Sequence, residues 1–372
     1  MEKPFGTHKR LDKPALDGIG IAIRRPALES ALPDAMLRNV EPPVSVLIHP
    51  TQFPLAVEAA LHKSLKTREM SHSFHYTTPK QALRWLRLHE AFSPAQTDPD
   101  CLRIYDTAFA RCAVELEGAR TIEVVSLGCG GGQKDAQLLR RLSQDLPGVR
   151  LRYVPVDVSP SLVLTARRCA IDAGLAPENN APIVIDLAAC EDWAAGLDPA
   201  LGDSARRVVC FFGMMPNFQP EAVLPQLSRL IRAQDRLLVS ANLAPGVDYR
   251  AGVEGVLPLY DNVLTREWLW SVLLDLGLNR EDGRMDFSVN CPEGGDGLRR
   301  IESNVTFARA CQIPYGRAVY AFEAGETFRL FFSYRHTPQR LVGQLSPHGL
   351  SVAAHWINAT GEEGVFDCLR GV

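Results

Sequence analysis

The feature that most limits the possible fold is an alternation of strand-like and helix-like segments between residues 121 and 243. Short runs of β-branched and apolar residues, such as TIEVVSLG, are separated by amphipathic runs such as QKDAQLLRRLSQDL. Buried strands joined by helices indicate a largely parallel sheet with helices on both faces and right-handed crossovers. The predicted strands are 121–128, 151–158, 181–188, 206–213 and 235–243, and the predicted helices between them are 133–146, 161–174 and 221–232.

The alternation stops after residue 243 and returns near residue 336. A long helix is predicted over 259–278, and the segments that begin at Met285, Arg299, Arg317 and Thr327 predict short antiparallel strands. A helix over 337–350 and strands over 351–359 and 364–370 follow, and two further helices are predicted over 81–92 and 102–116. We therefore expect one domain from residues 100–245 and 336–372, a second from 46–99 and 246–335, and a poorly ordered or wrapping N-terminal arm over 1–45.

Charge and composition exclude several classes of protein. The formal net charge of −3 provides no general positive field, so nucleic acid is not expected as the main partner. No apolar run approaches the length of a membrane span, and the N-terminus lacks the apolar stretch of a signal peptide. The nine cysteines are scattered without a C-x-x-C pair, which favours free thiols in the cytoplasm. His75, His89 and His336 lack the spacing of metal ligands, so no metal is expected.

A glycine-rich loop links the first strand of the alternation to its helix. Gly128, Gly130 and Gly132 would let the backbone turn sharply and approach a ligand at the helix N-terminus. A dinucleotide fingerprint requires a glycine where Gln133 stands, so the G-x-G-x-G spacing favours a nucleoside cofactor without a pyrophosphate. The alternative is a tight turn without a ligand.

Acidic residues end the next two predicted strands. Asp157 could accept hydrogen bonds from both ribose hydroxyls, and Asp186 could meet an adenine amino group. Each has a structural alternative, which for Asp157 is capping of the helix that begins near Ser159. The loop and two spaced acids at successive strand ends together indicate a nucleoside site.

These segments resemble a known family. The runs SLGCGGGQKDAQLL, YVPVDVSPSL, IDLA and GMMPNF are similar to those of the histidine-specific, S-adenosylmethionine-dependent methyltransferases, and VLPLYDN, RRIESNVTF and EAGETFRLFFSYRH continue the similarity. It extends from about residue 70 to the C-terminus. The resemblance implies a Rossmann-like class I methyltransferase sheet with an inserted, mixed α+β substrate domain.

The resemblance also implies cofactor roles. Gly128 and its neighbours would hold the methionine part of S-adenosylmethionine, and Lys134 would lie near its carboxylate. Asp157 would bind the ribose, and Asp186 with Leu187 the adenine. Without the resemblance, the alternative for Lys134 is a solvated surface charge.

The acceptor pocket is expected to consist of polar contacts rather than strong catalytic groups. By the resemblance, Asn217 and Tyr260 would hold the backbone end of an amino acid, Glu302 and Asn304 would grip its far end, and Tyr76 would cover cofactor and acceptor. The alternation of RRIESNVTF places Glu302 and Asn304 on one face of a strand. Each position also has a structural reading: a turn for Asn217, an interface for Tyr260 and an exposed polar face for the strand.

The expected function is methyl transfer to the amine or ring nitrogen of a histidine-like amino acid or related small metabolite. Met214, Met215 and Asn304 depart from the family pattern and point to a possible change of acceptor. The alternatives are a module that binds S-adenosylmethionine without catalysis and another enzyme class on the same sheet. The partner is expected to be a small molecule, and the sequence indicates no oligomeric state.

Overall fold

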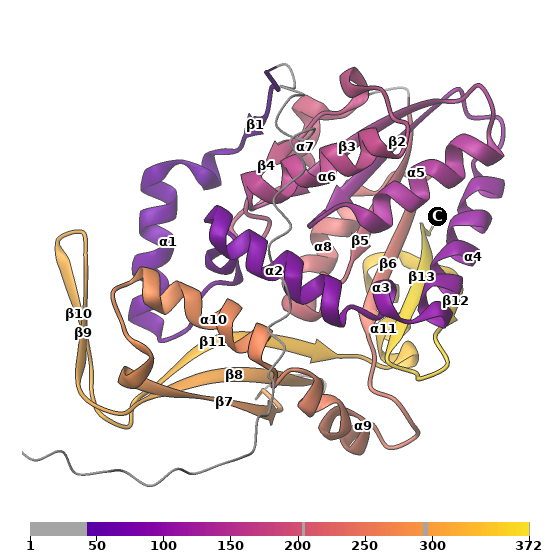
Figure 1. The fold of residues 1–372 in the computed structure, drawn as a ribbon. Coiled ribbons are helices and arrows are strands. Elements are labelled where there is room, and N and C mark those ends of the chain that lie inside the picture. Colours follow the sequence, from indigo (N-terminus) through magenta and orange to yellow (C-terminus); the bar gives the residue numbers. More distant parts are fainter. Residues whose placement is uncertain (1–42, 203–204, 293–296, 372) are drawn as a thin grey trace, which may run out of the picture. The chain divides into compact units, whose positions relative to one another are not determined.

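A central sheet of eight strands organises the computed structural model, which describes residues 43–202, 205–292 and 297–371 (Figure 1). The strand order is β1-β4-β3-β2-β5-β6-β13-β12. Strands β1 to β6 are parallel to one another, whereas β13 is antiparallel to both β6 and β12. Their bounds are β1 Leu47–Ile48, β2 Thr121–Leu127, β3 Arg150–Asp157, β4 Ile183–Val184, β5 Arg206–Phe212, β6 Arg236–Asn242, β12 Leu350–Ile357 and β13 Glu363–Arg370.

The third predicted strand, 181–188, is much shorter in the structure, where β4 ends at Val184 and the chain turns at residues 187–189. The Asp186 carboxylate accepts backbone hydrogen bonds from Ala188 and Ala189, which holds this turn. Strand β1 was not predicted. Its two residues, which lie in the segment expected to belong to the second domain, extend the parallel edge of the central sheet beside β4.

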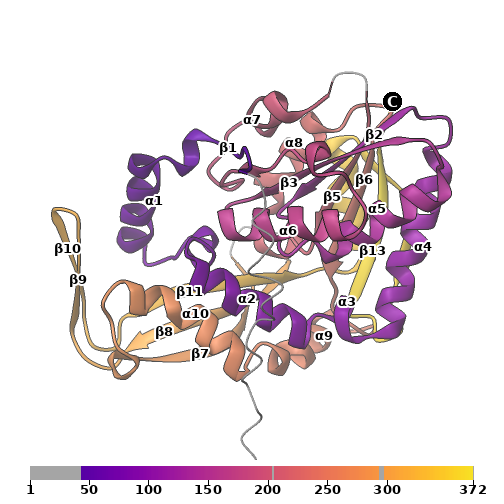
Figure 2. The same ribbon diagram turned by 45° about the horizontal axis from the view of Figure 1, so that its top comes forward.

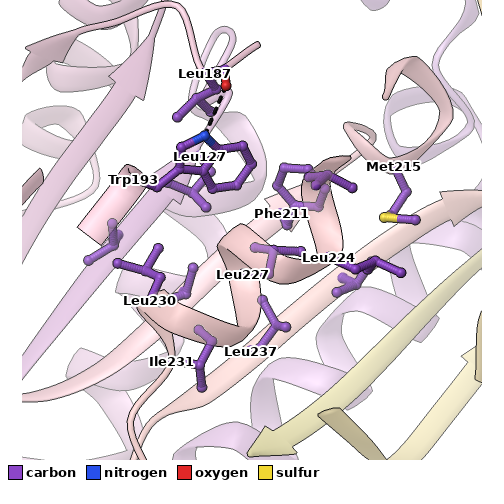
Figure 3. Close-up of a cluster of buried hydrophobic side chains, with 14 of the residues drawn as sticks. Leu127, Leu187, Trp193, Phe211, Met215, Leu224, Leu227, Leu230, Ile231 and Leu237 are labelled. Carbon is purple, nitrogen blue, oxygen red and sulfur yellow. Dashed lines mark hydrogen bonds between the residues drawn. The ribbon is translucent and has the colours of Figure 1, made fainter. Parts of the chain in front are cut away.

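Helices cover both faces of this sheet. The cluster in Figure 3 packs one face against α7 (Trp193–Leu197), α8 (Pro220–Leu230) and α11 (Pro338–Leu345). The other face packs against α4 (Pro99–Glu115), α5 (Gln133–Asp145) and α6 (Pro160–Asp172). Side chains of β2 alternate between the two clusters, with Val125 and Leu127 in one and Ile122 and Val124 in the other. Both faces are therefore buried, which explains the continuous apolar character of these strands.

A separate antiparallel sheet follows α9 (Tyr249–Val256) and α10 (Val263–Asp275). It has the order β11-β8-β7, with β7 Gly283–Asn290, β8 Arg299–Phe307 and β11 Thr327–Arg335. A two-stranded hairpin of β9 (Cys311–Tyr315) and β10 (Ala318–Phe322) projects from this region in both views (Figures 1 and 2). The prediction missed β9 and extended the α10 helix too far toward Leu259, which lies in a separate 3₁₀ turn.

The N-terminal helices pack on this second region. Buried side chains of α1 (Pro54–Thr67) and α10 share one apolar cluster with β8 and β11. Helix α2 (Pro79–Phe92) lies beside α10 in both views, and short α3 (Pro94–Thr97) follows it. Helix α2 begins at a Thr78 capping box closed by Gln81.

The α/β fold with a Rossmann-like sheet and a separate antiparallel region is confirmed. All of these elements belong to one compact unit, Ser45–Val372, and its division into a cofactor domain and a substrate domain stays a prediction. The predicted N-terminal arm lies outside the described residues, except for its last positions from residue 43. No helix in the described parts of the chain combines the length and apolar character of a membrane span.

Candidate active site

A cavity of about 380 Å³ opens at the carboxyl ends of the parallel strands. The residues that end or follow β2, β3, β4, β5 and β6 supply one wall, namely Gly128, Asp157, Asp186, Gly213 and Asn242. Side chains of α2, α10 and β11 supply the opposite wall, among them Trp85, Trp268 and Phe331. The carboxyl edge of a parallel sheet is the usual ligand position in open α/β folds, and this volume suits a small-molecule site.

The glycine loop forms the floor of this cavity. Gly128, Gly130 and Gly132 have φ angles of 70°, 52° and 75°, in the left-handed region that favours glycine. The backbone N–H of Gly130 donates to the Asp157 carboxylate over 3.1 Å. A Cβ atom added to Gly132 would lie 2.6 Å from the Ala166 Cα, so α6 packs directly on the loop. The loop shape therefore depends on the absence of side chains.

Replacing Gly132 with alanine should destabilise the protein by more than the 1–3 kcal/mol or so that an unfavourable φ costs, because the Ala166 backbone must also move. Gly118→Ala is the matched control, since Gly118 has a φ of 78° and nothing within 4 Å of an added Cβ. Urea unfolding of both variants measures the difference. Equal losses would show that close packing at Gly132 is unimportant.

Asp157 links the loop to the next helix. Its carboxylate accepts hydrogen bonds from the backbone N–H groups of Gly130 and Ser159, over 3.1 and 3.0 Å. The side chain is buried, and this burial raises the pKa of Asp157 to about 6 despite those hydrogen bonds. Asp157 thus holds the turn before α6, whose N-cap is Ser159 and not Asp157. Asp157 also lines the cavity, and its carboxylate retains lone pairs for a ligand.

Asp186 and Leu187 line the cavity beside β4. Burial raises the pKa of the Asp186 carboxyl, which is bonded to the backbone of Ala188 and Ala189. The Leu187 carbonyl accepts a hydrogen bond from the Trp193 indole over 2.9 Å, the dashed line in Figure 3. This contact fixes the Leu187 backbone at the edge of the cavity.

Lys134 also lines the cavity, at the start of α5. Its ammonium group donates to the Tyr105 hydroxyl over 2.7 Å and lies 3.2 Å from a Glu363 carboxylate oxygen. Although burial acts to raise it, the charge of Lys134 and the Tyr105 hydrogen bond hold the pKa of Glu363 below its ordinary value. Lys134 is thus a half-buried, paired cation and not the solvated charge of the alternative reading.

Tyr260 joins the two walls through hydrogen bonds. Its hydroxyl lies 2.8 Å from the Ser333 hydroxyl and accepts a hydrogen bond from Arg335 over 3.0 Å. The amide of Asn242 reaches the same oxygen at 3.5 Å. Asn217 lines the cavity from the short 3₁₀ turn after β5, with its amide directed at the Gly213 carbonyl over 3.5 Å.

Aromatic rings form the roof. Tyr76 lines the cavity, and its ring centroid lies 5.5 Å from Trp268 and 5.9 Å from Trp85. Burial raises the pKa of the Tyr76 hydroxyl, and the nearby charge of Asp157 acts in the same direction. Tyr76 therefore stays protonated at neutral pH and can donate a hydrogen bond.

Two half-buried histidines, His72 and His89, add no charge to the cavity. Burial lowers the pKa of His72 to about 3, with a further contribution from neighbouring positive groups, and lowers that of His89 to about 4. Both line the cavity and are neutral at pH 7. Within the described segments, no group of three or more His, Cys, Asp or Glu side chains could hold a metal ion.

Glu302 and Asn304 do not line the cavity. Ser303 pairs with Phe331 across the β8–β11 ladder, whereas Glu302 pairs with Phe332. Because Phe331 faces the cavity and side chains alternate along a strand, Glu302 and Asn304 face the other side of the sheet. The alternation was predicted correctly, but not which of its two faces meets the cavity.

Glu302 is instead buried in an ion-pair cluster. Its carboxylate lies 2.5 Å from an Arg300 nitrogen and 3.5 Å from an Arg329 nitrogen, and accepts a hydrogen bond from Asn290 over 3.2 Å. These contacts explain why an acid is required at a position with 5% exposure. The structure therefore separates Glu302 and Asn304 from the other candidate residues.

The two methionines of GMMPNF have different environments. Met214 lines the cavity and packs over Gly128, where an added Cβ would lie 2.3 Å from the Met214 sulfur. Met215 is fully buried in the core cluster against α8 and α11. Only Met214 is therefore placed to influence an acceptor.

Sequence reasoning missed one row of cavity residues on β11. Phe331, Ser333 and Arg335 alternate along the strand and all line the cavity. A serine and an arginine on one face of an otherwise apolar strand were the available signal.

Comparison with known proteins identifies the family. A sequence model of the histidine-specific, SAM-dependent methyltransferases matches residues 84–368. None of the curated proteins searched matches the chain. Among solved structures, a putative methyltransferase of Thermobifida fusca YX is 10% identical with a TM-score of 0.44, covering 83% of this chain and 97% of that one.

Two further structures are similar at this level. Magnesium protoporphyrin IX methyltransferase (ChlM) from Synechocystis PCC 6803, with bound SAH, is 16% identical with a TM-score of 0.40, covering 79% of this chain and 95% of that one. The mitomycin 7-O-methyltransferase MmcR is 14% identical with a TM-score of 0.38, covering 86% and 70%. Because the family model spans most of the sequence, the chain belongs to the histidine-specific methyltransferase family and is an enzyme that uses S-adenosylmethionine.

Proposed function

We propose that this enzyme methylates a nitrogen atom of a small acceptor, a histidine-like amino acid or a related amine, within the cavity at the sheet edge. The observation that carries the proposal is the continuity of that cavity. It joins the glycine loop, Asp157 and Asp186 on one side to Asn217 and Tyr260 on the other. Cofactor and acceptor can therefore lie in contact without a rearrangement of the sheet.

The cofactor half has the chemistry that S-adenosylmethionine requires. The glycine loop brings the backbone of Gly128, Gly130 and Gly131 to the cavity wall at the N-terminus of α5, an end of a helix that favours a negatively charged group such as a carboxylate. We assign Gly128, Gly130, Gly132 and Lys134 to the methionine part of the cofactor. Asp157 is assigned to the ribose, and Asp186 with Leu187 to the adenine.

The acceptor half combines polar groups with an aromatic enclosure. Asn217 can both donate and accept hydrogen bonds, which suits an α-amino acid or a similar amine. Tyr260 is held in position by Ser333 and Arg335, so its hydroxyl is oriented before a ligand binds. Tyr76 with its two tryptophan neighbours would exclude water from the reacting atoms.

Bound S-adenosylmethionine supplies a methyl group on a sulfonium sulfur. The residues of the chain need only align the acceptor nitrogen, keep its lone pair free and exclude water, and such positioning accounts for much of the rate. A protonated amine must first lose a proton. Neither His72 nor His89 is suited as a base near pH 7, because burial lowers their pKa values to about 3 and 4. We therefore expect the acceptor to enter unprotonated or to lose its proton to water.

Incubation with methyl-labelled cofactor and a panel of amino acids and amines tests this proposal. We expect labelled product from at least one amino acid or amine, with the label on nitrogen by mass spectrometry. Binding of S-adenosylhomocysteine should be measured on the same preparation. Tight binding without any labelled product would contradict the proposal and favour a binding module.

A further inference from the structure

Arg335 carries a buried charge that forms no ion pair with an acidic side chain in the described parts of the chain. It ends β11 on the face that lines the cavity and is 6% exposed. Its Nη1 donates to the Leu243 carbonyl over 3.1 Å and its Nη2 to the Tyr260 hydroxyl over 3.0 Å, whereas its buried Nε has no partner. Among the residues that the structure describes, no carboxylate oxygen lies within 4.0 Å of this guanidinium, since it takes part in none of their ion pairs.

Other buried arginines of the fold have acidic partners. Arg300 pairs with Glu302, Arg236 with Asp367, and Arg207 with Glu123. Isolated buried charge is costly, and folded proteins normally pair it. Arg335 departs from this rule at the wall of the proposed active site, where a ligand could provide the missing charge.

We infer that Arg335 anchors a carboxylate of the acceptor. This inference rests on the proposed function and extends it, because it adds an anion requirement and a residue that enforces it. The guanidinium group can bind a carboxylate through two parallel hydrogen bonds, which fixes both position and orientation. Its contact with Tyr260 would align the acceptor with the polar groups already assigned to that half of the cavity.

The neighbours of Arg335 define the rest of the acceptor. Phe331 lies two strand positions away from Ser333 on the same row, and its ring centroid is 5.7 Å from Trp268 and 6.5 Å from Tyr260. These rings present apolar surface directly beside the anion anchor. The acceptor class is therefore a carboxylate with an uncharged aromatic or apolar body, such as an aromatic amino acid or neutral histidine, and not a polyamine.

Matched acids and amides test this inference. L-Histidine, L-phenylalanine and L-tryptophan would each be compared with the corresponding amide, by calorimetric binding to the wild-type enzyme with S-adenosylhomocysteine present and by methyl transfer. The variants are Arg335→Met, which removes the charge, and Arg335→Lys, which keeps the charge but loses the paired geometry. Arg300→Met is the control for loss of an equally buried arginine outside the cavity.

Wild-type enzyme should bind at least one acid about 10- to 100-fold more tightly than its amide, the effect expected of a charge-assisted contact. Arg335→Met should abolish that preference, Arg335→Lys should restore part of it, and Arg300→Met should retain it. Equal binding of acids and amides by wild-type enzyme would overturn the inference. An equal loss of S-adenosylhomocysteine affinity in Arg335→Met would also overturn it, by assigning Arg335 to the cofactor.

The calorimetric comparison remains decisive where no methyl transfer is detected. An acid preference that depends on Arg335 would then support the anion anchor while the proposed reaction fails. Methylation of an amine that lacks a carboxylate, at the same efficiency in wild-type enzyme and in Arg335→Met, would support the reaction and overturn the anchor.

Discussion

Glu302→Gln is expected to lower the free energy of unfolding by about 3–5 kcal/mol, the cost of breaking a buried ion pair by removing one charge. The Glu302 carboxylate contacts both Arg300 and Arg329 from a position with 7% side-chain exposure. Glutamine would leave the buried Arg300 guanidinium without its carboxylate partner, whereas Arg329 would keep its ion pair with Glu69. Urea unfolding monitored by tryptophan fluorescence measures the loss.

The same variant separates a structural role for Glu302 from an acceptor role. Because Glu302 faces away from the cavity, the ranking of acceptors and the affinity for S-adenosylhomocysteine should stay as in the wild-type enzyme under conditions where the variant is folded. Asp286→Asn on the adjacent strand is the control, since its pair with Arg284 is solvent-exposed and should contribute at most about 1 kcal/mol. A changed acceptor ranking with unchanged stability would contradict this assignment.

Asp157→Ala is expected to weaken S-adenosylhomocysteine binding by about 1–3 kcal/mol, or roughly 5- to 150-fold, through loss of hydrogen bonds to a charged group. The loop would also lose the contact between Asp157 and Gly130. Calorimetry gives the affinity, and thermal unfolding shows how much of the loss reflects a disturbed loop. Asp192→Ala is the control, since it removes a carboxylate that caps α7 outside the cavity. This variant should bind S-adenosylhomocysteine with the affinity of the wild-type enzyme.

Cofactor binding should also depend on pH through Asp157. Its folded-state pKa of about 6 lies above the ordinary value of 3.8, so the free enzyme takes up a proton as the pH falls through 6. A neutral carboxyl is a weaker acceptor for ribose hydroxyls, and affinity should therefore decline below about pH 6 and level off above it. The stability of the protein should change in the opposite direction. Burial of the charged Asp157 carboxylate destabilises the folded state, so its protonation should raise the free energy of unfolding as the pH falls from about 6 to about 4. A wild-type affinity profile that is flat from pH 5 to 8 would contradict the ribose assignment.

The sheet could be predicted because its local signals agree with its tertiary environment. The β2 strand is apolar on both faces, and both faces are covered by helices. The glycine loop and Asp157 follow strands whose order fixes where they meet, so the sequence was sufficient to bring them together. The short strand β1 could not be predicted, because two residues are too few to show the alternation of apolar and polar side chains that marks a strand. Their pairing with β4 also depends on the completed sheet.

The acceptor half was harder to predict because a strand has two faces. Alternation shows that Glu302 and Asn304 share a face, but it does not show which face meets a cavity formed with α10 and β5. The ladder with β11 decides this, since it aligns Ser303 with Phe331. Arg335 was missed for a related reason, because only its burial without an acidic partner distinguishes it from a surface arginine.

A crystal structure of the complex with S-adenosylhomocysteine tests the central claim most directly. The predicted result places the ribose at Asp157, the adenine beside Asp186 and Leu187, and the sulfur facing the part of the cavity bounded by Tyr260 and Asn217. Cofactor bound elsewhere on the folded protein, or bound in this cavity with its sulfur directed away from Tyr260, would contradict the account.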